Sequence, residues 1–120
     1  ALRPSHGVLT LKDVIGRALS GDPGCRRVLA DAGEALGLAL SGVVNLLNPE
    51  VIVIGGQMAR VGDLLLDPAR RVIERCALPS AAQSLTLRVG ALADEADVVG
   101  ALALANEVHE SAQRAALALA

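Results

Sequence analysis

The chain of 120 residues contains no Phe, Tyr or Trp, so any hydrophobic core must be built from aliphatic side chains and alanine. Proteins that bind single-stranded nucleic acids commonly stack the bases on aromatic rings. The absence of aromatic residues therefore excludes that type of binding surface.

Basic charge is also scarce, because 11 Lys and Arg stand against 13 Asp and Glu, for a net charge of −2. A protein module that binds DNA or RNA neutralises phosphates with a basic stripe or patch. No such stripe occurs in the sequence, and we expect no direct nucleic-acid binding by this segment.

The sequence has only two cysteines, Cys25 and Cys76, with no C-x-x-C motif. Such a pair is typical of buried, unreactive thiols in a reducing compartment. No uninterrupted apolar run reaches the roughly 18 residues that span a bilayer; the most apolar run, 36–47, is broken by Ser41 and Asn45. We expect a cytoplasmic location without membrane contact.

The first half of the chain predicts two helices. Residues 1–10 form a lead-in, and apolar spacing predicts a short helix over 11–19. Asp22 and Pro23 are suited to the N-cap and first position of a second helix, which runs to about Leu47. Small residues recur along it, and each glycine costs about 1 kcal/mol relative to alanine; they are Ala32, Gly33, Gly37 and Ser41. We interpret this helix as central and buried, packed closely against another backbone.

The second half predicts two strands and two helices. Asn48-Pro49 ends the long helix, and 51–54 is predicted as a fully buried strand. A turn at 60–62, a helix over 63–78 with a second start signal at Asp67-Pro68, and a loop over 79–84 follow. Alternation over 85–89 predicts another strand, and Asp94 caps a last helix that reaches about Leu117, with a plain Ala-rich tail over 111–120.

The predicted order is α-α-β-α-β-α, with two parallel strands surrounded by long helices. A parallel sheet is stable when it has several strands covered on both faces. The 120 residues therefore constitute one segment that needs either another part of its polypeptide or a second copy. We expect that Ala1 is not the natural start of the protein.

A pair of glycines closes the first strand at its carboxyl end. In open α/β sheets, ligands bind just beyond the carboxyl ends of strands. Gly55 and Gly56 leave the backbone accessible to a flat or anionic group, or they simply permit a tight turn from strand to helix.

The run from Gly21 to Ala105 resembles the C-terminal part of the ROK family (repressor, open reading frame, kinase) of sugar-responsive regulators and sugar kinases. The resemblance rests on Gly21-Asp22-Pro23, Ala32-Gly33, Gly37, Asn45-Leu46-Leu47-Asn48-Pro49-Glu50, Val53-Ile54-Gly55-Gly56, Gly62-Asp63, Leu66, Pro68, Gly90-Ala91-Leu92, Val99-Gly100-Ala101, Leu104 and Ala105. It implies part of a lobe of the actin-like ATPase (ribonuclease H-like) fold.

In the kinases of this family, the glycine loop lies against the adenosine part of ATP. The resemblance thus implies a nucleotide site at Gly55, Gly56 and Gln57, on the adenosine side. Gln57 stands where the kinases usually have a third glycine, which favours the regulator branch. The family's phosphate loop, catalytic aspartate and zinc motif have no counterpart in the sequence, so we expect neither catalysis nor a metal site in this segment.

The resemblance leaves three hypotheses for function. As part of a regulator, the segment supplies core and dimer contacts, while other parts of the polypeptide bind the sugar and the DNA. As part of a kinase, it supplies one wall of a site for ATP and Mg²⁺. As a self-pairing module, it completes its sheet with a second copy of itself.

Other polar groups have structural interpretations that compete with functional ones. Asp94, Glu95 and Asp97 are typical of a helix N-terminus, although paired carboxylates also serve acid–base chemistry. Arg70 is expected to pair with Glu74 on a solvated face. Asn45 is expected to be buried near the glycine loop, binding either a ligand or the loop backbone.

Overall fold

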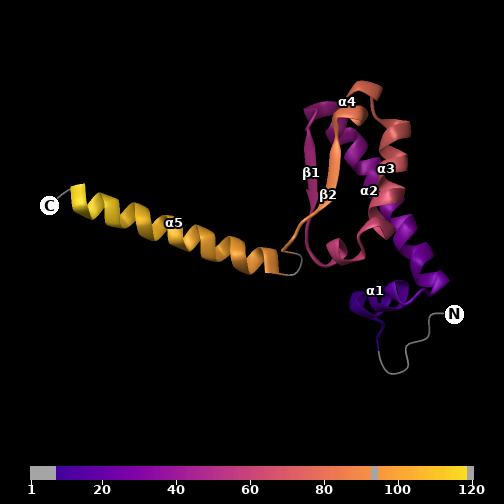
Figure 1. The fold of residues 1–120 in the computed structure, drawn as a ribbon, viewed down its shortest axis with the longest axis horizontal. Helices are drawn as coiled ribbons and strands as arrows, with labels where there is room; N and C mark the ends of the chain where they lie inside the picture. The colour runs from indigo at the N-terminus through magenta and orange to yellow at the C-terminus, as the bar shows by residue number, and fades with distance from the viewer. Residues whose placement is uncertain (1–7, 93–94, 119–120) are drawn as a thin grey trace.

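The computed structural model describes residues 8–92 and 95–118 as an α/β fold with a small parallel sheet (Figure 1). The elements are α1 (Leu11–Leu19), α2 (Pro23–Leu47), β1 (Val51–Ile54), the 3₁₀ helix η1 (Gln57–Val61), α3 (Asp63–Cys76), α4 (Pro79–Ser84), β2 (Thr86–Val89) and α5 (Ala96–Ala118). The α/β class was predicted, whereas η1 and α4 were not.

The two strands run parallel, with Val51 opposite Thr86 and Ile54 opposite Val89. Ile52 and Ile54 pack on a core formed with α2 and α3. The side chains of Val51 and Val53, on the opposite face, are 52% and 60% exposed. The prediction of a fully buried strand was therefore wrong for the described chain, because helices α2 and α3 cover only one face of this sheet (Figure 1).

Helices α2 and α3 pack with their backbones in close contact. A Cβ atom added at Gly37 would lie 2.5 Å from the carbonyl oxygen of Ala69, and one at Gly33 would collide with the carbonyl oxygen of Leu65. The Ser41 hydroxyl, on the same face, donates a hydrogen bond to the Gly37 carbonyl at 2.7 Å. The prediction that the small residues of α2 allow close backbone packing is confirmed.

The prediction of a central, buried helix was wrong for the opposite side of α2, which is open in the described chain. Leu38 and Leu46 are 63% and 83% exposed. In the described part of the chain, α2 is the one helix that could cross a membrane by length and composition, a criterion that core helices of soluble proteins also meet. The contact with α3 covers one side of α2, and the side that carries Leu38 and Leu46 stays uncovered among the described residues.

Helix α1 lies across the first turns of α2. Thr10 caps it reciprocally: the Thr10 hydroxyl accepts from the Asp13 N–H, while the Asp13 carboxylate accepts from the Thr10 N–H at 2.9 Å. Ile15 and Ala18 are buried against Leu29 of α2, in a second core that also includes Cys25, Val61 and Leu65. This core fixes α1 beside η1.

Three predicted boundaries in the second half need correction. The segment 79–84 is helical, because Pro79 occupies a first-turn position and two alanines follow it. The turn predicted at 60–62 is the end of η1. Helix α3 is continuous from Asp63 to Cys76, with the buried Pro68 inside it rather than at a new start.

Helix α5 extends away from the rest of the molecule (Figure 1). It begins at Ala96 with Asp97 in its first turn, and its predicted cap, Asp94, lies outside the described residues. Apolar side chains along it are more than 60% exposed; they are Val98, Leu102, Leu104 and Val108. A helix with such a surface requires a partner to remove it from water.

Candidate functional site

The glycine pair lies at the carboxyl end of the sheet, where both strands finish together. The Gly90 N–H, just after β2, donates to the Ile54 carbonyl at 2.8 Å. Gly56 has φ 71° and ψ −167°, a conformation that essentially only glycine adopts. An added Cβ at Gly55 or Gly56 would meet nothing within 4 Å, so the loop is open to an approaching group.

Gln57, directly after the pair, lines a hollow of about 290 Å³ between α1 and η1. Its other lining residues are Lys12, Ile15, Gly16, Leu19 and Arg60. Aliphatic walls, one amide and two cationic side chains suit a ligand that has a flat apolar part and an anionic part. The structure thus brings Gln57 into a cavity, while Gly55 and Gly56 are not among the residues that line it.

Sequence reasoning missed the contribution of α1 to this hollow. Lys12 is the only lysine in the chain, and Gly16, one turn later, leaves room beside it. The capping box of Thr10 and Asp13 was a detectable signal for the start of α1. The position of α1 beside η1 depends on the second core and could not be derived from spacing alone.

The carboxylates of Asp13 and Asp22 lie near this region but are engaged as helix caps. Hydrogen bonds from Thr10 lower the pKa of Asp13, and hydrogen bonds from Cys25 lower the pKa of Asp22. A general acid or base near neutral pH needs a pKa close to 7. Both groups stay ionised there, and we assign them to helix capping.

The cap at Asp22 makes stability depend on pH on the acid side. The Asp22 carboxylate accepts from the Cys25 N–H at 2.7 Å, and its pKa lies below the ordinary 3.8. Because the pKa is lowered, the stabilisation by the Asp22 carboxylate is complete above its pKa in the unfolded chain. It is lost as the pH falls through its pKa in the folded protein. We expect Asp22→Asn to keep the cap and to flatten the loss of stability below about pH 4.

Urea unfolding of Asp22→Asn at pH 7 and pH 3 measures this effect. Asp22→Ala, which removes the cap altogether, serves as the comparison and should be less stable at neutral pH. Equal acid sensitivity in the wild type and Asp22→Asn would contradict the assignment.

The two cysteines differ from each other. Cys25 is buried, and burial raises the pKa of its thiol, so it remains protonated. Cys76, at the end of α3, is exposed, so the prediction of two buried thiols was wrong for Cys76. Within residues 8–92 and 95–118, no three His, Cys, Asp or Glu side chains cluster as a metal site would require.

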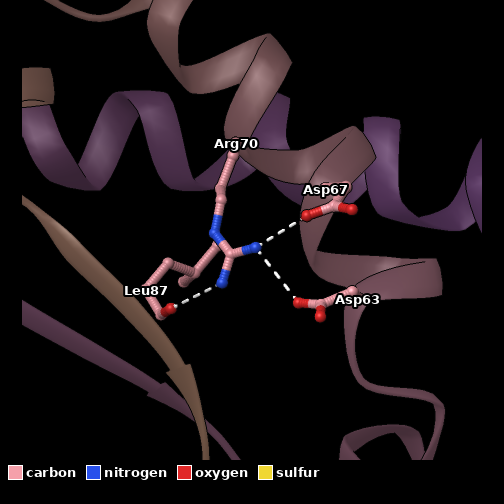
Figure 2. Close-up of polar contacts among 4 residues, drawn as sticks. All are labelled: Asp63, Asp67, Arg70 and Leu87. Carbon is pink, nitrogen blue, oxygen red and sulfur yellow. Dashed lines mark hydrogen bonds and ion pairs between the residues drawn. The ribbon is translucent and has the colours of Figure 1, made fainter.

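Asn45 and Arg70 have partners different from those predicted. Asn45 is exposed, and its side-chain oxygen accepts from the Leu78 N–H at 2.8 Å, which ties α2 to the start of α4 instead of to the glycine loop. Arg70 pairs with Asp63 and Asp67, on the preceding turns of α3, and not with Glu74 (Figure 2). Both residues have structural roles at these positions.

Comparison with known proteins identifies the family to which the chain belongs. Residues 3–108 match the ROK family. A glucokinase of Halalkalibacterium halodurans is 38% identical over 109 residues, which is 91% of this chain and 33% of the glucokinase. A xylose repressor of Caldicellulosiruptor bescii is 30% identical over 96 residues, 80% of this chain and 24% of the repressor.

A solved structure agrees with the sequence matches. The crystal structure of a ROK family transcriptional regulator, a homologue of the Escherichia coli MLC protein, is 32% identical, with a TM-score of 0.67 over 69% of this chain and 21% of that one. The chain thus spans 33% and 24% of the lengths of these two curated relatives. Kinases and repressors both occur among them, and the chain belongs to the ROK family.

Proposed function

We propose that this chain is the C-terminal part of a ROK-family, sugar-responsive transcriptional regulator of the cytoplasm. The observation that carries the proposal is Gln57, which follows the glycine pair and lines the hollow beside it. A side chain at this position takes space that a third glycine would leave to a nucleotide. The similarity to a xylose repressor and to a ROK transcriptional regulator supports the same branch.

In this role the segment contributes core packing, oligomer contacts and a vestigial nucleotide loop. Sugar binding elsewhere in the polypeptide changes the relative stability of two arrangements of its lobes, and α2 and α3 transmit the difference as a rigid pair. DNA is bound by a separate domain. Such coupling requires that sugar and operator prefer different arrangements.

A sugar kinase is the second candidate, favoured by the 38% identity to a glucokinase. The open backbone at Gly55 would then face adenosine, and the cationic side chains of Lys12 and Arg60 in the hollow would face the anionic part of the ligand. ATP and Mg²⁺ would be needed, with the phosphate-binding and catalytic groups supplied by other parts of the polypeptide.

A self-pairing module is the third candidate, for which the exposed apolar side chains of α5 are the specific observation.

The experiment uses the intact protein with two assays in parallel. Band shifts on its own upstream DNA, with a panel of hexoses and pentoses, measure operator binding, and a coupled assay measures ATP-dependent phosphorylation of the same sugars. A regulator shows sugar-dependent DNA binding without turnover. Turnover without DNA binding assigns the protein to the kinases. The absence of both activities supports the self-pairing module.

The variant Gly55→Ala separates the two main candidates. Gly55 has no positive φ and has free space at its Cβ, so alanine should fold normally there. In a kinase, the methyl group obstructs the nucleotide, and we expect affinity for an ATP analogue to fall at least about tenfold, roughly 1.4 kcal/mol. In a regulator, sugar-dependent DNA binding is unchanged. Gly42→Ala, on the open side of α2, is the matched control for both assays.

A further inference from the structure

The 3₁₀ helix η1 lies between two glycines whose backbone conformations other residues rarely adopt. Gly56, before it, has φ 71° and ψ −167°, and Gly62, after it, has φ 54° and ψ −127°. Within this segment the Ala59 N–H donates to the Gly56 carbonyl at 3.1 Å, and the Gly62 N–H donates to the Ala59 carbonyl at 3.2 Å. Because glycine restricts φ and ψ so little, the direction of η1 depends on what holds its two ends.

The two ends of η1 are held by different elements. At its start, the glycine pair continues directly from β1. At its end, the Leu65 and Leu66 N–H groups both donate to the Gly62 carbonyl at 3.1 Å, so the first turn of α3 follows at once. The position of that turn relative to the sheet therefore determines where η1, and Gln57 within it, lie.

Arg70 ties the first turn of α3 to the sheet. Its Nη1 donates to the Asp63 carboxylate at 3.2 Å and to the Asp67 carboxylate at 2.7 Å (Figure 2). Its Nη2 donates to the Leu87 carbonyl at 3.1 Å. That carbonyl faces away from β1, because the neighbouring Thr86 N–H pairs with β1 and alternate residues of a parallel strand point to the partner. The planar guanidinium has donors in fixed directions, so one side chain joins the two elements in a defined geometry.

The apolar contact between α3 and β2 is less directional than this bridge. Leu66 and Ile73 share with Leu87 the core that α2 and α3 form with the sheet. Apolar burial is non-directional, so it holds the helix near the strand without fixing the rotation of its first turn. Among the described residues, the bond from Arg70 to the Leu87 carbonyl is the only hydrogen bond between α3 and β2.

We propose that Arg70 is a positioning residue for the glycine loop: by fixing the first turn of α3 to β2, it holds η1 so that Gln57 lines the hollow beside α1. The network is exposed, since the side chains of Arg70, Asp63 and Asp67 are 40%, 76% and 54% exposed. Exposed ion pairs contribute little to global stability. The effect of the bridge is therefore local and falls on the segment between the two glycines.

This inference deepens the proposed function, because it rests on the glycine loop and Gln57 forming one side of a ligand site. Its experiment observes the loop without sugar, DNA or nucleotide. Its failure is therefore distinct from a failure of the proposed function, which the binding and turnover assays decide.

Amide hydrogen exchange of the intact protein, resolved to single residues, tests the position of η1. In Arg70→Ala we expect the amides of Ala59 and Gly62 to exchange about three- to tenfold faster than in the wild type. The Asn48 amide, which donates to the Val44 carbonyl at the end of α2, should be unchanged. Equal acceleration of all three amides would mean that Arg70 stabilises the fold as a whole, and unchanged exchange in η1 would mean that the core alone holds it. Either result would overturn the proposal.

Two further variants separate the bridge from its charge. Arg27→Ala removes an exposed arginine whose pair with Asp31, at 2.9 Å, lies within α2, so exchange in η1 should stay as in the wild type. Arg70→Lys retains the charge without the fork of donors, and we expect exchange in η1 as fast as in Arg70→Ala. Full restoration by lysine, or acceleration of η1 by Arg27→Ala, would assign the effect to surface charge and contradict the bridge.

Discussion

Gly37→Ala is expected to destabilise the protein by about 1–3 kcal/mol, although alanine is ordinarily the better helix former by about 1 kcal/mol. The added methyl group would lie 2.5 Å from the Ala69 carbonyl oxygen and 2.9 Å from the Ala69 Cα. Backbone atoms of α3 cannot move aside as a flexible side chain can, so α2 and α3 must separate. Urea unfolding of the purified variant measures the loss.

The matched control is Gly42→Ala in the same helix. Nothing lies within 4 Å of an added Cβ at Gly42, so only helix propensity and unfolded-state entropy act there. We expect a gain of about 0.4–1 kcal/mol. Opposite signs for the two variants identify backbone contact as the cause, whereas a gain for both would mean that α2 and α3 are not in contact at Gly37.

Leu29→Ala is expected to cost about 2–5 kcal/mol, the range for a leucine removed from a close-packed core. The Leu29 side chain is 2% exposed and packs with Ile15 of α1 and Val61 of η1. The loss should therefore concentrate where these two elements meet, and hydrogen exchange should show earlier opening of α1 than of α3.

The comparison variant is Leu38→Ala, because Leu38 is 63% exposed on the same helix. Removal of an exposed side chain is usually within about 0.5 kcal/mol of neutral. A cost at Leu38 similar to that at Leu29 would show that the open side of α2 is covered in the intact protein. This outcome would locate a contact between α2 and the remainder of the polypeptide.

Several elements could be predicted to the residue, since local signals are sufficient for them. Asp22 and Pro23 determine the start of α2, and Asn48, with φ 45°, its end. The strand 51–54 followed from four apolar β-branched residues between Pro49 and Gly55. The small-residue face of α2 also predicted a close helix contact, although not its partner.

Other features depended on contacts between distant segments. The partners of Arg70 were mispredicted because Asp63, Asp67 and the Leu87 carbonyl compete with Glu74 for one guanidinium. The hollow at Gln57 was not foreseen, since α1 contributes most of its lining from more than 35 residues earlier in the chain. The predicted nucleotide site at Gly55, Gly56 and Gln57 remains a prediction.

The sequence by itself determined the two strands and the helices other than η1 and α4, the family, and the requirement for close packing along Gly33 and Gly37, because caps, periodicity and glycine spacing act over a few residues. Only the tertiary structure decided that one face of the sheet is bare, that α5 lacks a partner among the described residues, and that Arg70 covers one edge of the sheet. Burial and edge pairing depend on what the rest of the molecule places beside an element, and the pattern of apolar residues along one strand is the same whether its partner is present or absent.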